Sequence, residues 1–411
     1  MKLTMKNIGV IRDAEIELNG ITVLTGLNGT GKSTTSKALY GVIAPYVNLS
    51  EKITNERTDS VRHIISYDLI AVLYEQGTLF DTPKDVLCSA LANKRLPIPE
   101  RYEEWVQLFP QLLKGKDSTL EKEVFPKFLE KLKRAVNRPD MDYVQYLLNG
   151  TIRWVFDEQI NTIGSSSPGE IALKAEQETQ IAWMKIAENK VVACSGEEIH
   201  TIQPIYIEPL HVLNGLNRNQ SEVPYTSELH DFLKGFGNSG RGKTFEEHES
   251  RERVLSFISS IIHGRLARSA FGEFVFKDEH FNETISLRNV ASGNKIFAVL
   301  QDLTEQGALR ENTVLIIDEP ESNQHPEWQL KLAEALVLIR RELGVRIFLT
   351  THSPYFLRGI EVYADEYELS GHCHYYQTQP TDDAATLFRI QNVDGNTDSI
   401  YRAFYMPFEE L

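Results

Sequence analysis

The sequence is short of cysteine, of long apolar runs and of positive charge, and each shortage excludes a class of protein. The cysteines Cys88, Cys194 and Cys373 form neither a disulfide framework nor a CxxC metal knuckle, so we expect a reduced, cytoplasmic protein. No run of about 18 apolar residues is present, which argues against a membrane span. The opening MKLTMKNIGV has no apolar core of a secretory signal. The net charge of −15 argues against a surface built mainly for nucleic acid.

A glycine-rich loop follows a short apolar strand near the N-terminus. The strand at Ile21–Leu24 leads into GLNGTGKSTT, Gly26 to Thr35, which fits the pattern G-x-x-x-x-G-K-[ST]. Glycines let backbone N–H groups point inward at a helix N-terminus, where they bind phosphate. A chance glycine turn is the alternative, and the flanking strand and helix disfavour it. The predicted nucleotide-binding residues of this loop are Gly26, Asn28, Gly29, Thr30, Gly31, Lys32, Ser33 and Thr34.

Two of these loop residues have predicted roles toward ATP and Mg²⁺. The Lys32 ammonium is expected to reach the β- and γ-phosphates, and the Ser33 hydroxyl to bind Mg²⁺. ATP and Mg²⁺ are therefore the predicted ligands of this segment.

A pair of carboxylates ends a second apolar strand. In TVLIIDEPE, the four apolar residues Val314–Ile317 are typical of a parallel strand that is buried on both faces. Asp318 and Glu319 follow at its C-terminal end, where open α/β sheets bind ligands. We predict that Asp318 holds Mg²⁺ together with Ser33, and that Glu319 polarises the attacking water. An ordinary acidic turn explains the pair alone, but the phosphate loop favours catalysis.

A histidine ends a third strand. The apolar segment Arg346–Thr351 runs into His352, and the helix predicted at Glu327–Leu343 separates it from the carboxylate strand. One helix between two parallel strands places them side by side, so His352 is expected next to Glu319 and within reach of a γ-phosphate. A lone histidine is usually structural, and this position favours a catalytic role.

The stretch NVASGNKIFAVL predicts a helix that begins at Ser292 and Gly293. Its apolar residues lie on one face, as a core helix requires: Ile296, Phe297, Leu300 and Leu303. An ordinary serine-capped core helix explains the stretch alone. The order of phosphate loop, Ser-Gly helix, Asp-Glu strand and His strand, however, resembles that of ABC-type ATPases.

This resemblance implies that Ser292 and Gly293 act in trans on the ATP held by a second copy of the chain. The chain would then close as a homodimer, or a higher homo-oligomer, around two ATP molecules. Asn294 and Lys295 depart from the glycine and glutamine that are commonest in the family signature.

Further segments are similar to OLD-family and related standalone bacterial ATPases, a set that includes subunits of Septu-type antiphage systems. These segments are EPESNQHPEWQ, TTHSPYFL and NVASGNKIF, within a resemblance that covers residues 1–45 and about 205–411. It implies an SMC-like ATPase that regulates a separate effector, a nuclease, because roughly 50 residues remain after the His352 helix, too few for the nuclease domain of OLD proteins.

The expected fold is α/β, a P-loop NTPase of ABC/SMC-head type. A mixed sheet is flanked by helices, with an antiparallel β lobe and a mainly helical insertion. We assign residues 1–50 and 200–411 to the head, and residues 51–199 to a helical insertion followed by a small β-rich segment. Asp140 and Asp142 in PDMD are interpreted as loop residues.

Two other functions are compatible with the motifs. A DNA repair or recombination ATPase would act directly on DNA, through GFGNSGRGK (235–243) or through HGRLARS (263–269), interpreted as a basic helix end. A surface loop and a solvated face are the plainer interpretations of these two segments. A transporter subunit is disfavoured by the 260 residues between Lys32 and Ser292, and no membrane partner is expected.

Overall fold

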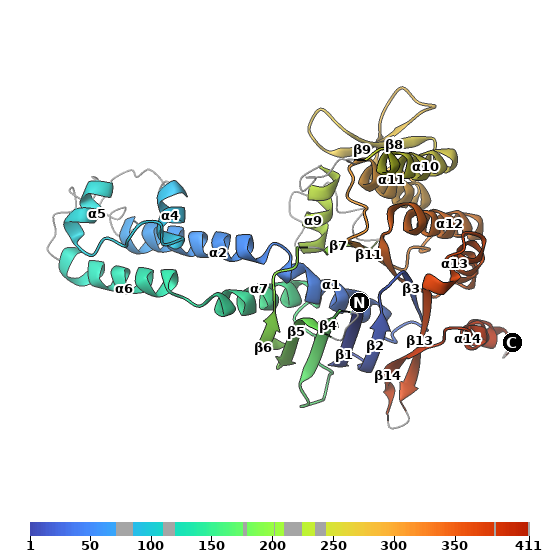
Figure 1. Cartoon of the computed structure of the whole chain (residues 1–411), viewed down its shortest axis with the longest axis horizontal. Helices are drawn as coiled ribbons and strands as arrows, with labels where there is room; N and C mark the ends of the chain where they lie inside the picture. Colours follow the sequence, from blue (N-terminus) through green and yellow to red (C-terminus); the bar gives the residue numbers. More distant parts are fainter. Residues whose placement is uncertain are drawn as a thin grey trace. The chain divides into compact units, whose positions relative to one another are not determined.

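The computed structural model describes residues 1–70, 85–109, 120–175, 179–200, 202–208, 224–234, 244–381 and 384–409. The chain divides into two compact units, drawn in Figure 1. The head unit comprises Met1–Val47 and Leu148–Leu411, and the helical unit comprises Asn48–Leu147. The segment predicted as a glycine-rich basic loop, 235–243, lies outside the described residues.

A large mixed sheet forms the centre of the head unit. Its strands, in spatial order, are β6 (Lys190–Gly196), β5 (Gln180–Ala187), β4 (Gly169–Lys174), β1 (Lys2–Ile8), β2 (Ile11–Glu17), β14 (Ala384–Asn392), β13 (Cys373–Thr381), β3 (Ile21–Thr25), β12 (Arg346–Thr351), β11 (Thr313–Asp318) and β7 (Gln203–Ile207).

The strands β13, β3, β12, β11 and β7 run parallel and carry the predicted motifs at one edge. Thr350 of β12 pairs with Leu24 of β3 on one side and with Asp318 of β11 on the other. Every residue of β3 and β11 is buried, as the continuous apolar runs predict. The strand ends therefore lie level, which brings together motifs that are far apart in the sequence.

The antiparallel half of the sheet corrects one predicted boundary. We expected the insertion to extend to residue 199, whereas the helical unit ends at Leu147 and the strands β4, β5 and β6 continue the main sheet. β4 pairs with β1, with Leu173 opposite Leu3. The physical reason is strand pairing. β5 alternates buried and partly exposed residues, and β4 has three consecutive buried residues, so both strands are stabilised by neighbouring strands of the main sheet.

The head unit also contains helices that pack on the main sheet, on the β lobe and on one another. They are α1 (Lys32–Ile43), α9 (Pro224–Leu233), α10 (Phe245–Ile261), α11 (Ser292–Glu305), α12 (Pro326–Leu343), α13 (Pro354–Glu366) and α14 (Asp398–Glu409), with 3₁₀ turns at Ala44–Tyr46, Leu287–Asn289 and Ser370–His372. α1 contacts strands of both halves of the sheet, and α12 packs against β12, α10 and α13. Among the described helices, none combines the length and the apolar character needed to span a bilayer.

A small antiparallel sheet forms the β lobe. It contains β8 (Gly264–Arg268), β9 (Phe274–Asp278) and β10 (Ile285–Ser286) in the order β10-β9-β8. The basic helix end expected at 263–269 is therefore wrong, because this segment is strand β8. Leu266 is buried while Arg265 and Arg268 are exposed, a pattern set by pairing with β9.

The helical unit contains α2 (Leu49–Ile64), α4 (Asp85–Ala92), α5 (Tyr102–Leu108) and α6 (Phe125–Val136), with π-helical turns at Ile65–Ile70 and Leu120–Val124. The loop predicted at Asp140 and Asp142 is also wrong, since both lie in the first turn of α7 (Asp140–Val155). Acidic residues there are stabilised by the helix dipole, and Asp140 forms an ion pair with Arg57 of α2.

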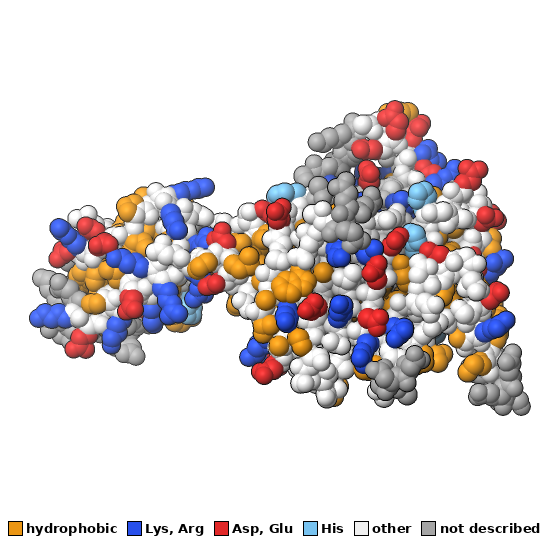
Figure 2. Space-filling model, turned by 60° about the horizontal axis from the view of Figure 1, so that its bottom comes forward, with side chains coloured by type: hydrophobic (Ala, Val, Ile, Leu, Met, Phe, Trp, Pro, Cys, Tyr) orange, Lys and Arg blue, Asp and Glu red, His pale blue; other side chains and the backbone are white. Residues whose placement is uncertain are grey.

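Charged side chains of both signs are interspersed on the face of the molecule drawn in Figure 2. This agrees with the sequence, in which acidic residues exceed basic residues, 58 against 43. A surface with charges of both signs and a net negative charge helps to keep a protein dispersed in water. Such a surface does not attract a polyanion over its whole area.

Candidate nucleotide-binding site

The glycine-rich loop connects β3 to α1, and two of its glycines fit only because they lack a side chain. Gly31 has φ +97°, and a Cβ there would lie 2.4 Å from Cδ1 of Ile11. A Cβ on Gly26 would lie 1.9 Å from Oγ1 of Thr378 in β13. Both contacts are closer than van der Waals packing permits. The loop therefore follows its path against β2 and β13 only with glycine at these two positions.

Lys32, the first residue of α1, places its ammonium against the backbone of this loop. Its ammonium is buried and donates to the carbonyl oxygens of Gly26 at 3.0 Å and Leu27 at 3.1 Å. The same Nζ atom lies 3.5 Å from Oε1 of Glu319. Asn28 and Gly29 are exposed at the loop tip. The Lys32 ammonium thus lies between the loop and the carboxylate of Glu319, the residue that follows β11.

Thr30, Ser33 and Thr34 complete the loop and the first turn of α1. Thr30 is buried, and its hydroxyl donates to the carbonyl of Leu27 at 2.7 Å. The hydroxyl of Thr378 donates to Thr30 Oγ1 at 2.8 Å. Ser33 and Thr34 are half-buried. The structure therefore fixes the loop by side-chain hydrogen bonds as well as by its glycines.

Asp318, at the end of β11, is a buried carboxylate in contact with α1. Its Oδ1 accepts hydrogen bonds from Ser36 at 3.3 Å and from the Thr350 hydroxyl. Burial raises its pKa, while hydrogen bonds from Thr350 and Ser33 lower it. The two predicted metal ligands, Ser33 and Asp318, are therefore brought into contact.

The donor atoms of this pair suit Mg²⁺. A hydroxyl and a carboxylate are hard oxygen ligands, and Mg²⁺ takes few protein ligands because it keeps water and substrate phosphate oxygens in its shell. Among the described residues, no group of three or more His, Cys, Asp and Glu side chains could hold a metal. The site thus fits a metal that is completed by a nucleotide better than it fits a self-sufficient metal centre.

Glu319 adopts an unusual backbone conformation directly after the strand. Its φ is +51°, a region that non-glycine residues rarely adopt. Its N–H donates to the Thr350 hydroxyl at 3.0 Å. The carboxylate Oε1 lies 3.3 Å from Nδ1 of His352. Hydrogen bonding from His352 and the charge of Lys32 lower the pKa of Glu319 against the effect of its burial.

His352 follows β12 and lies between two carboxylates. Its Nδ1 is 3.3 Å from Oε1 of Glu319 and 3.5 Å from Oε1 of Glu321. The hydrogen bond with Glu319 raises the pKa of His352, with a further contribution from the charge of Glu321. The predicted position of His352 beside Glu319 is confirmed.

Glu321 belongs to this site and was not predicted from the sequence. It is 3% exposed, and its Oε1 accepts from the Thr351 hydroxyl at 2.6 Å and from the His352 N–H at 3.0 Å. Its Oε2 is buried without a hydrogen-bond partner among the described residues. Burial raises the pKa of this carboxyl. The second glutamate of the segment EPE, two residues after Glu319, was the sequence signal that could have identified this residue.

Ser292 and Gly293 form a separate pair at the start of α11. The Ser292 hydroxyl donates to the Asn323 carbonyl at 2.8 Å. A Cβ on Gly293 would lie 2.9 Å from Cε3 of Trp328 in α12. The helix begins at Ser292 as predicted, and its apolar face is buried. These contacts tie the start of α11 to the loop that follows Glu321.

Comparisons with protein families find AAA domains in two parts of the chain. Residues 208–358 match a family described as an AAA domain, putative AbiEii toxin, of a type IV TA system. Residues 2–67 match a second AAA-domain family. No curated protein sequence matches the chain.

A search of solved structures finds similarity to SMC heads and to an ABC cassette. An SMC head bound to the C-winged helix domain of ScpA has a TM-score of 0.45 at 10% identity, covering 97% of this chain and 98% of that one. The SMC head domain from Thermotoga maritima has a TM-score of 0.38 at 10% identity, covering 95% and 98%. An ATP-binding cassette of an ABC transporter, in its ADP conformation, has a TM-score of 0.34 at 10% identity, covering 99% and 96%.

The family matches and the sheet topology agree on one fold. The AAA-domain matches at 2–67 and 208–358 include the glycine-rich loop, Asp318, Glu319 and His352. Both matched segments are therefore similar to AAA domains, and in the structure they contribute to one α/β unit with a mixed sheet and a glycine-rich phosphate-loop motif.

Proposed function

We propose that this chain hydrolyses ATP at the edge of the parallel strands and closes as a dimer around two ATP molecules. The observation that carries the proposal is the line of contacts from Lys32 through Glu319 to His352, with distances of 3.5 Å and 3.3 Å. A phosphate-loop cation and a side chain that positions the attacking water recur in enzymes that transfer a phosphoryl group to water, and His352 adds a hydrogen-bond donor beside them.

Each residue has a role that follows from its chemistry. Lys32 would bind the β- and γ-phosphates, and Ser33 and Asp318 would hold Mg²⁺. The metal, when bound, neutralises negative charge on the phosphates. Glu319, kept ionised by Lys32 and His352, would orient the attacking water and accept its proton. His352 would donate a hydrogen bond toward the γ-phosphate.

The α11 start supports the dimeric part of the proposal. Ser292 and Gly293 lie at the N-terminus of a helix of 14 residues, where unpaired N–H groups and the helix dipole favour an anion. Their fixed position beside Trp328 suits a preformed surface. We propose that this surface covers the γ-phosphate held by the partner copy.

The partner regulated by this switch is proposed to be a nuclease of an antiphage system. The family description that matches residues 208–358 names a putative toxin of a type IV TA system, which supports a role in a two-protein defence module. Co-purification from the native host tests this part. A nuclease retained by the wild-type chain with ATP, and lost from Lys32→Ala, is the expected result.

The test of the ATPase proposal is Glu319→Gln. We expect turnover to fall by about 10²–10⁴-fold, the usual contribution of a general base, while ATP binding persists and ATP-bound dimer accumulates in size-exclusion chromatography with light scattering. The matched control is Glu327→Gln, on the exposed start of α12. Normal turnover in Glu319→Gln would place the base elsewhere. Turnover that rises only with DNA would favour the DNA repair alternative.

A further inference from the structure

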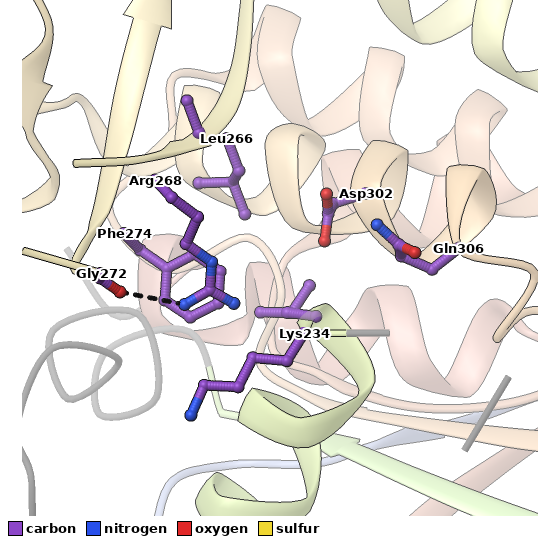
Figure 3. Close-up of a pocket in the computed structure, with 9 residues that line it drawn as sticks. Lys234, Leu266, Arg268, Gly272, Phe274, Asp302 and Gln306 are labelled. Carbon is purple, nitrogen blue, oxygen red and sulfur yellow. Dashed lines mark hydrogen bonds between the residues drawn. The ribbon is translucent and has the colours of Figure 1, made fainter. Parts of the chain in front are cut away.

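A cavity of about 490 Å³ lies in the head unit, away from the glycine-rich loop motifs. Its walls come from the end of α9, from strands β8 and β9, and from the C-terminal end of α11 (Figure 3). The residues that matter for its chemistry are Lys234, Leu266, Arg268, Phe274, Asp302 and Gln306. A volume of this size is typical of small-molecule sites.

One wall of the cavity is a flat, two-layer platform. The guanidinium carbon of Arg268 lies 3.5 Å from the centre of the Phe274 ring, and Nη1 donates to the Gly272 carbonyl at 3.2 Å. Figure 3 shows the guanidinium stacked over the ring. Phe274 is buried, whereas Arg268 is exposed. The outer face of the guanidinium therefore presents a planar cation that is already fixed in orientation.

The opposite wall contains an unsatisfied acceptor. Oδ2 of Asp302 is buried and has no hydrogen-bond partner among the described residues. Such an atom costs free energy unless a donor reaches it. Burial and the nearby charge of Glu305 raise the pKa of Asp302 to about 7, against the opposing effects of the Arg268 charge and of a hydrogen bond from Gln306. Gln306, one turn further along the chain, lines the same wall, and its side chain donates a hydrogen bond to the Asp302 carboxylate.

We propose that this cavity binds a nucleoside monophosphate whose base carries an amino group, either as a free nucleotide or as the terminal nucleotide of a strand. The base would stack on the Arg268 platform, as bases stack on guanidinium planes in proteins that bind single-stranded nucleic acid. Its amino N–H would satisfy Asp302. Lys234, exposed where it lines the cavity, would pair with the phosphate.

The position of the cavity also suggests what its ligand does. Asp302 lies near the end of α11 and Gln306 caps it, while Ser292 and Gly293 begin the same helix. A rigid helix transmits displacement from one end to the other. Occupancy of the cavity would therefore change ATP turnover. This effect on turnover rests on the proposed ATPase function, whereas the binding of a nucleotide in the cavity is independent of that function.

The experiment titrates AMP, CMP, GMP and UMP calorimetrically into the full chain carrying Lys32→Ala, which removes binding at the phosphate loop. We expect AMP, CMP and GMP to bind, and UMP to bind at least about tenfold more weakly, because uracil is the one base of the four without an exocyclic amino group. Thermal unfolding confirms that the variant is folded. The wild-type chain saturated with ATPγS gives the same comparison if the variant is not.

Variants within the cavity decide the location of the bound nucleotide. Arg268→Leu and Asp302→Ala should each weaken AMP binding at least about tenfold. Arg265→Leu, a matched change on the same strand outside the cavity, should leave it unchanged. A 5′-phosphorylated oligonucleotide that binds more tightly than AMP identifies a strand end as the natural ligand, and weaker binding identifies the free nucleotide.

The proposal is overturned if no mononucleotide binds at millimolar concentration, or if AMP binding survives both cavity substitutions. ATP titrated into the same proteins separates this result from the proposed function. ATP binding that persists in Lys32→Ala would contradict the assignment of the phosphate loop. In that case, binding in the cavity would be tested by introducing Arg268→Leu and Asp302→Ala into the wild-type chain.

Discussion

The side chains of the nucleotide site form a continuous line of charges. Lys32, Glu319, His352 and Glu321 follow one another with distances of 3.5, 3.3 and 3.5 Å. Of Glu319, His352 and Glu321, only Glu321 is almost fully buried. A buried carboxylate that accepts from the His352 backbone fixes where the imidazole can lie. Glu321 is therefore a positioning residue for His352.

Glu321→Gln tests this positioning role. The amide keeps an oxygen that can accept from Thr351 and His352 but removes the negative charge beside the imidazole. We expect turnover to fall about tenfold, since hydrogen bonds to charged groups contribute roughly 1.5–3 kcal/mol. ATP affinity should hardly change, because Glu321 makes no contact with the glycine-rich loop among the described residues.

The pH profile distinguishes positioning from a purely structural role. Glu319 and Glu321 both raise the pKa of His352, so the protonated imidazole persists to higher pH than in an ordinary histidine. Removing the charge of Glu321 lowers that pKa again. The alkaline limb of the ATPase profile should therefore move to lower pH in Glu321→Gln. A lower rate with an unmoved alkaline limb would contradict the proposed link to His352.

The sequence was sufficient to place the loop, Asp318, Glu319 and His352, because each follows a short apolar strand and parallel strand ends meet at one edge. Glu321 could not be placed in the same way. Its role depends on a loop that turns back so that its carboxylate reaches the N–H of His352, 31 residues away. Local periodicity carries no information about such a contact.

Among the elements, those with continuous apolar patterns were predicted well. β3, β11, β12, α11 and α12 are present where the sequence indicated, with α12 starting at Pro326. Apart from the first turn of α7, the errors concern elements whose identity depends on strand pairing. Strand β8 is short and basic, so only its bonds to β9 make it a strand. The boundary of the insertion likewise depends on the pairing of β4 with β1.

The start of α11 yields a prediction about assembly. Ser292→Arg places a large cation at the helix N-terminus, where it opposes the dipole and blocks a closely packed surface. We expect each subunit to bind ATP as before, whereas ATP-bound dimer and turnover are lost. Nucleotide binding by fluorescence and mass by light scattering, measured on one preparation, separate the two effects.

Ser292→Ala is the matched control for this substitution. It removes the hydrogen bond to the Asn323 carbonyl but adds no bulk, so the dimer should form with ATP and turnover should fall only modestly. If Ser292→Arg dimerises and turns over ATP normally, the role in trans is wrong. If Ser292→Ala loses the dimer as completely as Ser292→Arg, the local hydrogen bond rather than blocked closure is responsible.

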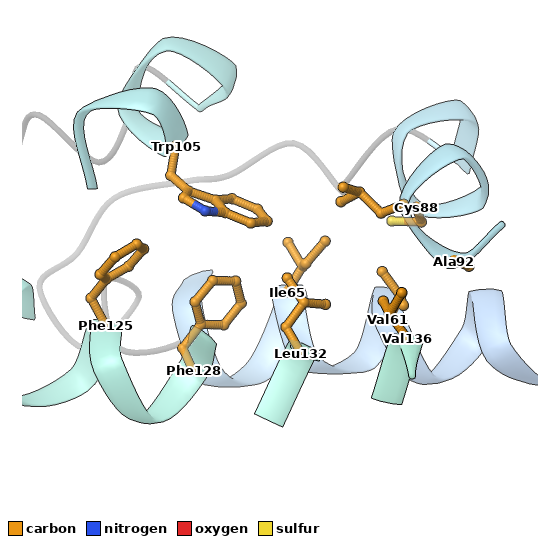
Figure 4. Close-up of a cluster of buried hydrophobic side chains, with 10 residues drawn as sticks. Val61, Ile65, Cys88, Ala92, Trp105, Phe125, Phe128, Leu132 and Val136 are labelled. Atoms are coloured by element: carbon orange, nitrogen blue, oxygen red, sulfur yellow. The ribbon is translucent and has the colours of Figure 1, made fainter. Parts of the chain in front are cut away.

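At the scale of the whole molecule, the chain leaves the head unit after Val47 and returns at Leu148. The residues that line the nucleotide site all lie outside the helical unit. The helical unit in turn has a core of its own, in which Trp105 of α5 faces Phe125, Phe128 and Leu132 of α6 (Figure 4). Two separate cores in one chain predict two separable stabilities.

Trp105 is the largest of the fully buried side chains in the described part of the helical unit. Its side chain is fully buried, its ring meets Phe128 edge-on with centres 4.9 Å apart, and Nε1 donates to the Pro99 carbonyl at 2.8 Å. Trp105→Ala would leave a large cavity and an unpaired carbonyl. We expect a loss of about 3–5 kcal/mol in the free energy of unfolding of this unit.

Hydrogen exchange by mass spectrometry locates this loss. Faster exchange in Trp105→Ala should be confined to residues 48–147, and ATP affinity should stay within about twofold of wild type, because every contact described for the nucleotide site joins residues of the head unit. Tyr146→Ala, which truncates an aromatic side chain that is 62% exposed, is the control and should change little. Loss of ATP binding together with the helical core would show that the two units fold as one, and that the helical unit holds the nucleotide site in shape.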